Sequence, residues 1–237
     1  MKQLIRLESG PIHVEGMLDI PENPEGIVLF AHGSGSSRLS PRNNFVAGVL
    51  RKAGLGTLLM DLLTAKEDQD YQHRFDIQLL AKRLNDAINW IRHHDETGNA
   101  RIGLFGASTG AAAALQVAAA RGAEIAAVVS RGGRPDLAGR QMLEKVVSPT
   151  LLIVGGSDDV VIELNRSALA ELHCERRMDI IPGATHLFEE PGKLEAVAEI
   201  ARDWFVQHLL QLRHDYVGGR WVDGAGTSGS VGQPGPY

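Results

Sequence analysis

Five short apolar segments, separated by longer segments of mixed polarity, restrict the fold of this chain more than any other feature. Short runs of this kind are typical of strands in a parallel sheet that helices cover on both faces. A sixth segment, Arg177–Ile181, is less apolar and is expected nearer to an edge; one or two short strands are expected between Gln3 and Ile20. The five apolar segments are Ile27–Ala31, Thr57–Met60, Ile102–Phe105, Ala126–Val129 and Thr150–Val154.

The clearest helical period lies between Phe75 and His93. Apolar side chains recur there every three or four positions and form one stripe along the helix. Because strands alternate with helices along the chain, we predict right-handed crossovers and a mostly parallel, doubly wound α/β sheet. The other expected helices are Asn44–Ala53, Thr109–Ala120, Glu163–Leu172 and Leu194–Leu212.

Length and charge predict one domain that does not bind nucleic acid. The chain of 237 residues suits a single α/β domain, which we expect at residues 1–217. Residues 218–237 include seven glycines and lose the apolar period, so we predict a flexible Gly-rich tail there. A formal net charge of −5 without a basic cluster argues against nucleic acid or an anionic membrane surface as the main partner.

The cysteine content and the lack of long apolar runs predict a cytoplasmic protein. Cys174 is the only cysteine, so no disulfide can form within the chain, which fits a reducing compartment. The first residues lack the apolar run of a signal peptide, and no apolar run is long enough for a transmembrane helix. We therefore expect no membrane partner.

One segment of the chain, residues 106–110, has the pattern G-x-S-x-G, with Ser108 at its centre. The pattern is short and occurs by chance, so its context matters more than the match. An apolar strand segment leads into it and an alanine-rich helical segment leads out, which is the strand–turn–helix arrangement of a nucleophile elbow. The alternative is an ordinary strand-to-helix turn that uses glycine for its flexibility.

A serine hydroxyl needs a base to take its proton before it becomes a good nucleophile. Among the nine histidines, His186 lies in the loop between the last expected strand and the C-terminal helix. The chain order serine, acid, histidine places the base in this loop. The alternative for His186 is a loop histidine with a purely structural hydrogen bond.

Two aspartates are candidates for the acid that orients the histidine. Asp158 and Asp159 both follow the strand segment Thr150–Val154, and their spacing does not choose between them. One would accept the imidazole N–H and thereby fix its tautomer. The other would be a solvated charge or the cap of the following helix.

The glycine-containing loop after the first apolar strand is a candidate oxyanion site. Its backbone can present an N–H to a reacting carbonyl and, with the Thr109 N–H, form a two-donor oxyanion hole. We expect Gly33 to contact the substrate and His32 to brace the loop. Arg38 occupies the third glycine position of a dinucleotide fingerprint, and the chain lacks a P-loop pattern. No metal or organic cofactor is implied.

Arg131 begins a loop, Arg131–Asp136, that follows a core strand, on the side of the sheet where ligands bind in such folds. Its guanidinium can pair with a substrate carboxylate. An Arg–Asp contact that holds the loop is an equally good interpretation, since structural ion pairs are common. Both interpretations stay open at this stage.

Several segments together resemble the dienelactone hydrolase-like members of the α/β-hydrolase superfamily, in particular a group of which some are fused to phosphoribosyltransferase domains. The resemblance spans about residues 27–210 and implies the α/β-hydrolase fold. The family's acid motif G-G-x-D-x-V-V matches residues 155–161 and implies Asp158 as the acid, and the resemblance implies Ser34 as the oxyanion residue. The segments are HGSGSS, GASTGAAAAL, SRGGRPDLAG, LLIVGGSDDVV and PGATHLFEEPG.

The sequence departs from the family at the nucleophile. Dienelactone hydrolases proper use a cysteine there, whereas this chain has Ser108, and Cys174 lies far along the chain. We therefore expect hydrolysis of small carboxylic esters through an acyl-serine intermediate, with Ser108, Asp158 and His186 as the triad. No phosphoribosyltransferase signature precedes the hydrolase motifs. The alternatives are a lactone, thioester or amide as the bond cleaved, or a binding module without catalysis.

Overall fold

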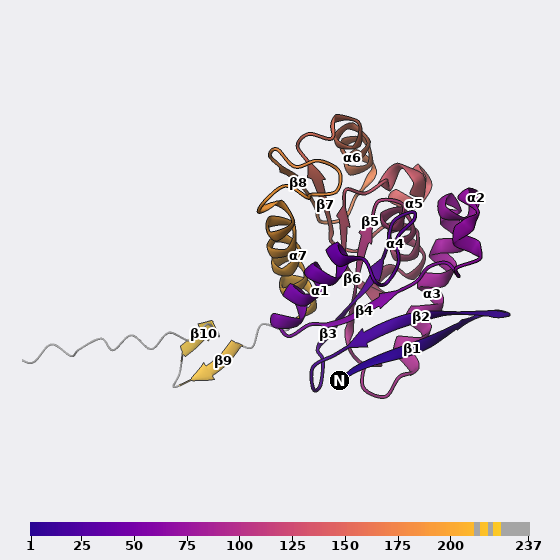
Figure 1. Ribbon diagram of the computed structural model, residues 1–237. Helices are drawn as coiled ribbons and strands as arrows, with labels where there is room; N and C mark the ends of the chain where they lie inside the picture. The colour runs from indigo at the N-terminus through magenta and orange to yellow at the C-terminus, as the bar shows by residue number, and fades with distance from the viewer. Residues whose placement is uncertain (211–213, 218–219, 224–237) are drawn as a thin grey trace, which may run out of the picture.

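The computed structural model describes residues 1–210, 214–217 and 220–223. Its main sheet has eight strands in the order β1-β2-β4-β3-β5-β6-β7-β8, with helices on both faces (Figure 1). The strands are β1 (Lys2–Ser9), β2 (Ile12–Asp19), β3 (Gly26–Ala31), β4 (Gly56–Met60), β5 (Arg101–Ala107), β6 (Ile125–Arg131), β7 (Thr150–Gly155) and β8 (Arg176–Ile181).

Strands β3 to β8 run parallel to one another, as the alternation of strands and helices predicted. At one edge, β1 and β2 form an antiparallel hairpin, and β2 pairs antiparallel with β4. β8 is the opposite edge strand and is partly exposed, which agrees with its lower apolar content. The mostly parallel α/β-hydrolase architecture expected from the sequence is therefore confirmed.

Two helical layers enclose the sheet. α1 and α7 cover one face through side chains such as Leu50 and Phe205, and α3 and α4 cover the other through side chains such as Leu84 and Leu115. Among the described residues, no helix is both long and apolar enough to cross a membrane. The α-helices are α1 (Pro41–Lys52), α2 (Tyr71–Phe75), α3 (Ile77–His93), α4 (Thr109–Arg121), α5 (Arg140–Leu143), α6 (Asp159–Glu171) and α7 (Lys193–Leu209), and the 3₁₀ helices are η1 (Glu67–Gln69), η2 (Gly122–Glu124) and η3 (Pro135–Ala138).

The last strands form a separate two-stranded hairpin. β9 (His214–Val217) pairs antiparallel with β10 (Arg220–Asp223). The tail expected at residues 218–237 includes β10, and its remaining residues, 218–219 and 224–237, lie outside the described part of the chain.

Candidate active site

Ser108 lies in a sharp turn between β5 and α4. Its backbone angles, φ 50° and ψ −121°, lie in a region that residues other than glycine rarely adopt, so the turn is strained. A Cβ on Gly106 would lie 2.4 Å from Ala111 Cα, and one on Gly110 would lie 2.1 Å from the Ala31 carbonyl oxygen. Both flanking positions therefore exclude any residue larger than glycine, which explains the G-x-S-x-G pattern and gives Ser108 the geometry of a nucleophile elbow.

Asp158 and His186 meet beyond the carboxyl ends of β7 and β8. His186 Nδ1 lies 2.7 Å from Asp158 Oδ2, with Asp158 largely buried and His186 partly exposed. Because Nδ1–H donates to the carboxylate, Nε2 is left free to accept a proton. Asp159, in contrast, is exposed in the first turn of α6. The contact to the histidine thus involves Asp158 alone of the two aspartates.

The His186 ring lies next to the Ser108 turn. Ala107 is paired in register with Arg131 on the neighbouring strand, about 5 Å away in a sheet. A Cβ on Gly132, the next residue, would lie 3.5 Å from His186 Cε1. Within the described part of the chain, no hydrogen bond joins Ser108 Oγ to His186. Such bonds are often long before substrate binds, so the arrangement is compatible with proton transfer.

The loop after β3 packs directly against Ser108. A Cβ on Gly33 would lie 2.9 Å from Ser108 Cβ and 3.7 Å from its Oγ. Within residues 1–210, the Ser34 N–H donates no hydrogen bond. Thr109 is the first residue of α4, and the N–H groups of the first turn have no acceptor within the helix. Ser34 and Thr109 line the same narrow crevice, which is too small to hold a water molecule. Gly33 and Thr109 both adjoin Ser108, so the Ser34 and Thr109 N–H groups are candidates for the donors of an oxyanion hole.

His32 holds this loop in place through both ring nitrogens. It is 5% exposed; Nδ1 lies 2.9 Å from the Gly33 carbonyl oxygen, and Nε2 lies 2.9 Å from the Leu62 nitrogen. Nδ1 must donate and Nε2 must accept, which fixes a neutral imidazole. Burial lowers the pKa of His32, more than the Gly33 contact and the nearby Asp61 charge raise it. His32 is thus a brace for the loop.

Arg131 is the unusual side chain of the site. It is 8% exposed, and its Nε and Nη1 atoms are buried without a hydrogen-bond partner among the described residues. Its guanidinium lies 6.0 Å from the centre of the Phe188 ring. Burial, followed by repulsion from Arg42, lowers the pKa of Arg131 to about 10, so it remains charged at neutral pH. The loop contact considered from the sequence belongs instead to Arg134, which binds Asp136 at 2.9 and 2.8 Å.

Residues 61–76 form the other wall of the crevice, through Leu63, Asp68 and Arg74. Sequence analysis did not assign Leu63, Asp68 or Arg74 to the site, although the pattern Thr64-x-x-Glu67 predicts a capped turn there. The structure contains this capping box: the Thr64 N–H donates to Glu67 (2.8 Å) and the Glu67 N–H donates to Thr64 Oγ1 (3.2 Å).

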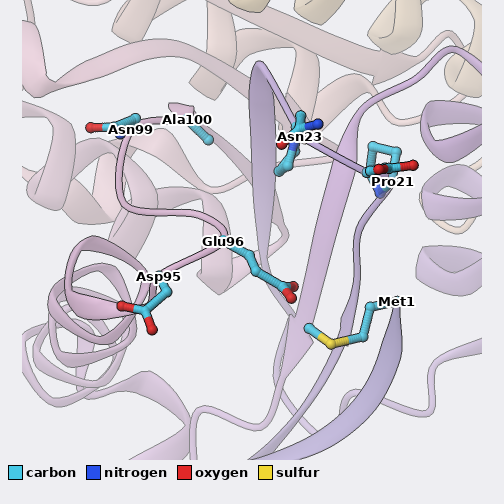
Figure 2. Close-up of a pocket in the computed structure, with 9 residues that line it drawn as sticks. Met1, Pro21, Asn23, Asp95, Glu96, Asn99 and Ala100 are labelled. Carbon is cyan, nitrogen blue, oxygen red and sulfur yellow. The ribbon is translucent and has the colours of Figure 1, made fainter.

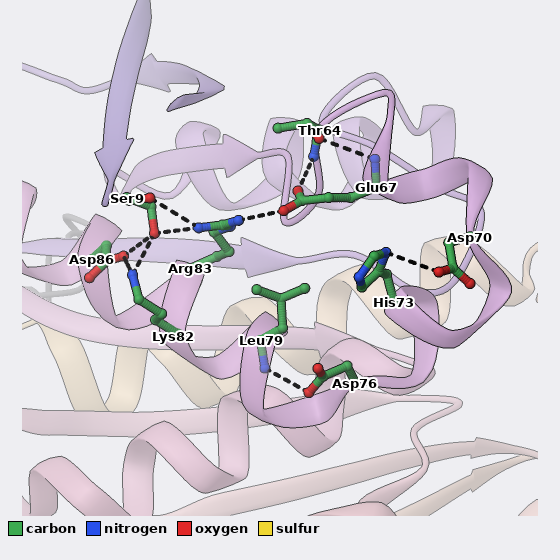
Figure 3. Close-up of polar contacts among 10 residues, drawn as sticks. All are labelled: Ser9, Thr64, Glu67, Asp70, His73, Asp76, Leu79, Lys82, Arg83 and Asp86. Carbon is green, nitrogen blue, oxygen red and sulfur yellow. Dashed lines mark hydrogen bonds and ion pairs between the residues drawn. The ribbon is translucent and has the colours of Figure 1, made fainter. Parts of the chain in front are cut away.

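A polar network, which we call the Arg83 network, anchors this segment to the rest of the molecule (Figure 3). It comprises Ser9, Glu67, Lys82, Arg83 and Asp86. Arg83, 5% exposed, donates from Nη2 to Glu67 at 2.7 Å and from Nη1 to Ser9 Oγ at 2.6 Å. Lys82 donates to Ser9 Oγ and to Asp86, each at 2.8 Å. β1, α3 and the crevice wall are thereby joined.

A hollow of about 550 Å³ (Figure 2) lies at the amino ends of the parallel strands, at the other end of β5 from Ser108. Ala100, which lines it, directly precedes β5, whereas Ser108 directly follows β5. Seven strand residues separate the two ends by about 23 Å. The hollow, lined partly by Glu22, Asp95 and Glu96, is therefore remote from the triad. Among the described residues, no three His, Cys, Asp or Glu side chains form a group suited to a metal ion.

Residues 14–213 match the model of the dienelactone hydrolase family. The chain belongs to this family. The resemblance inferred from its motifs is thereby confirmed, and family membership supports a hydrolase.

Similar proteins differ in the activity that they are named for. Two Mycobacterium tuberculosis proteins, each named "Putative phosphoribosyl transferase", are 56% identical over 205 residues, which are 86% of this chain and 46% of each relative. The chain therefore spans about half the length of these relatives. A crystal structure of a dienelactone hydrolase from Anabaena variabilis is 53% identical, with a TM-score of 0.85 over 89% of this chain and 99% of that one.

A more distant structure shares the fold alone. An α/β serine hydrolase without lid from Xanthomonas campestris is 20% identical, with a TM-score of 0.72 over 89% of this chain and 96% of that one. The α/β-hydrolase fold is thus common to the chain and to both structures.

Proposed function

We propose that this protein hydrolyses small carboxylic esters through an acyl-serine intermediate, with Ser108 as nucleophile, His186 as base and Asp158 as the acid that orients it. The observation that carries the proposal is the 2.7 Å contact between His186 Nδ1 and Asp158, next to a serine in elbow geometry. This combination leaves Nε2 free to take the Ser108 proton.

The reaction has two steps. Ser108 Oγ attacks the ester carbonyl as His186 Nε2 takes its proton, and the Ser34 and Thr109 N–H groups stabilise the negative oxygen that forms. His186 then protonates the departing alcohol, which leaves an acyl-serine. In the second step His186 activates water, which releases the acid and restores Ser108. Asp158 holds the imidazole tautomer and stabilises the imidazolium in both steps.

The single cysteine does not fit the role of nucleophile. Cys174 Sγ lies 3.9 Å from Oγ1 of Thr150. Thr150 is the first residue of β7, so this contact is at the amino ends of the parallel strands, whereas Ser108 follows the carboxyl end of β5. Burial raises the pKa of this thiol despite its contact with Thr150, so the reactive thiolate is disfavoured. A serine rather than a cysteine mechanism is therefore proposed for this family member.

The name of the M. tuberculosis relatives suggests another activity, phosphoribosyl transfer. The shared segment is less than half of those proteins, and within it the elbow, the acid–base pair and the two backbone donors all serve acyl transfer. We therefore propose hydrolysis for this chain.

Labelling with a fluorophosphonate probe tests the proposal without knowledge of the substrate, since the probe reacts with an activated serine. We expect the protein to be labelled, Cys174→Ser to be labelled equally, and Ser108→Ala to remain unlabelled. A wild-type protein that is folded but unlabelled would support a binding module instead. A screen of esters, lactones, thioesters and amides then identifies the bond cleaved.

A further inference from the structure

Asn165 is a fully buried amide on α6, outside the proposed triad and the oxyanion donors. Its Nδ2 donates to the Val161 carbonyl oxygen at 2.8 Å and to the Gly133 carbonyl oxygen at 3.0 Å. Because both contacts are to acceptors, they fix which end of the amide carries the hydrogens. The Val161 contact lies within α6, whereas the Gly133 contact joins α6 to the segment after β6.

Stability alone does not account for an amide at this position. Asn165 Oδ1 is buried without a hydrogen-bond partner among the described residues. A buried acceptor of this kind lowers stability, and an apolar side chain of the same shape would avoid the loss. In an α-helix the Val161 carbonyl is also the acceptor of the Asn165 backbone N–H, so it does not need the side chain. The contact that an apolar residue could not supply is therefore the one to Gly133.

Gly133 belongs to residues 131–134, which we call the clamp loop because its backbone holds Ser108 on two sides. The Ser108 N–H donates to the Arg131 carbonyl oxygen at 3.4 Å, and the Arg134 N–H donates to the Ser108 carbonyl oxygen at 3.0 Å. Ser108 has a φ of 50°, and a strained conformation of this kind persists only where its surroundings hold it. The clamp loop therefore helps to keep the nucleophile in its elbow geometry.

The clamp loop also adjoins the proposed base. A Cβ on Gly132 would lie 3.1 Å from the His186 carbonyl oxygen and 3.5 Å from His186 Cε1. The Gly132 N–H donates to the Ile153 carbonyl oxygen at 2.7 Å, on β7. Among the described residues, Asn165 is the one side chain that hydrogen-bonds the backbone of the clamp loop. A shift of this loop would therefore move Ser108 relative to His186.

We propose that Asn165 is a positioning residue for the proposed ester hydrolysis: through Gly133 it holds the clamp loop against α6 and so keeps Ser108 within reach of His186. The proposal rests on that function and adds a residue to it. Asn165 is fully buried and does not contact substrate, so its loss should lower kcat and leave KM nearly unchanged. A displacement of about 1 Å at a catalytic group can cost about 10²-fold in rate.

The test compares Asn165→Leu and Asn165→Ser with the wild type in the hydrolysis of p-nitrophenyl butyrate. Leucine is similar in shape to asparagine and has no donor. A helical serine can still donate to the carbonyl four residues before it, here that of Val161, but its side chain is too short to reach Gly133. We expect kcat to fall at least tenfold in both variants, with KM within about twofold of the wild-type value.

Thr97→Val is the matched control. Thr97 is fully buried, and its Oγ1 donates to the Ile91 carbonyl oxygen at 2.9 Å, in the segment that precedes β5. This variant loses a buried hydrogen bond remote from Ser108 and should keep the wild-type kcat. In every variant kcat is calculated per active site, counted by complete fluorophosphonate labelling, so that an unfolded fraction does not lower it. The rate of labelling should fall with kcat in the two Asn165 variants.

The outcomes separate the two proposals. A folded wild-type protein that is not labelled contradicts ester hydrolysis itself. If the wild type is labelled, a loss of kcat smaller than tenfold in Asn165→Leu, or an equal loss in Thr97→Val, overturns the positioning role and leaves ester hydrolysis intact. Wild-type kcat in Asn165→Ser also overturns it, because the contact within α6 would then suffice. If neither Asn165 variant folds, Asn165 is a structural residue and the proposal fails.

Discussion

The Arg83 network and the candidate active site are both polar clusters built around a buried arginine, but they differ in how completely they are paired. In the network, both terminal nitrogens of Arg83 have partners at 2.6 and 2.7 Å, and only its Nε is buried without one among the described residues. At the site, Arg131 has none, and Thr109 Oγ1 is likewise buried without a partner among the described residues.

The difference indicates what each cluster is for. A satisfied polar network specifies one packing of the chain, whereas each buried group without a partner lowers stability. Arg131 and Thr109 Oγ1 therefore contribute less to stability than the paired groups of the Arg83 network do. Substitutions in the Arg83 network should lower stability, and substitutions at the site should lower activity without lowering stability.

The largest effect is expected for Ser108→Ala. Loss of the nucleophile leaves only binding and the oxyanion hole, so ester turnover should fall about 10⁴-fold or more. The unfolding free energy should stay the same or rise, because alanine removes a polar group from the turn while its strained φ persists. Steady-state rates and urea unfolding of the same preparation measure both. A purified variant that keeps most of its activity would contradict the assignment of Ser108.

The two neighbouring aspartates provide a matched pair for the next effect. Asp158→Asn should lower kcat by about 10⁴-fold, because the amide no longer fixes the catalytic tautomer of His186. Asp159→Asn alters an exposed residue in the first turn of α6 and should change kcat little, with a stability change of at most about 1 kcal/mol from the helix dipole. Equal activity losses in the two variants, at unchanged melting temperatures, would show that the site uses both carboxylates.

The parts of the fold and the site that depend on local sequence could be predicted. The order of strands and helices follows from apolar runs and periodicity, and the elbow follows from glycines that the approach of Ala111 and Ala31 makes obligatory. The position of His186 in the loop after β8 follows from chain order within such a sheet.

The rest depends on contacts between residues distant in sequence. Arg42 lies close enough to Arg131 to lower its pKa, although the two residues lie on different elements far apart in the chain. Whether Arg131 or Arg134 binds Asp136 depends on side-chain direction at the end of a strand, which spacing does not fix. Leu63, Asp68 and Arg74 lie in a segment that has a capping signal but no apolar period, so their place near the site could not be inferred.

The comparison of the two arginines can itself be tested through stability. Arg83→Met leaves Glu67 without its buried partner, so we expect a loss of about 3 kcal/mol. At about 2–4 °C per kcal/mol this corresponds to a fall in Tm of roughly 6–12 °C. Arg131→Met removes an unpaired charge and places an apolar chain against Phe188, so its Tm should be unchanged or higher. Calorimetry of both variants measures the contrast, and a similar fall in both would mean that Arg131 is structural.

His32 lies at the site, but, like Arg83 and unlike Arg131, it has hydrogen-bond partners, at both ring nitrogens. It therefore tests whether hydrogen-bond pairing or location decides the role of a buried polar group. Pairing predicts a structural role that depends on pH. Burial lowers the pKa of His32 in the folded state, so below about pH 6.5 the unfolded chain binds a proton that the folded chain does not. The stability contributed by neutral His32 is therefore present above that pH and is lost as the pH falls, by up to about 1.4 kcal/mol for each pH unit. Urea unfolding between pH 5 and 8 should show a shallower pH dependence for His32→Gln than for the wild type. Parallel curves for the two proteins would mean that folding leaves the pKa of His32 unchanged, and would contradict its role as a neutral brace.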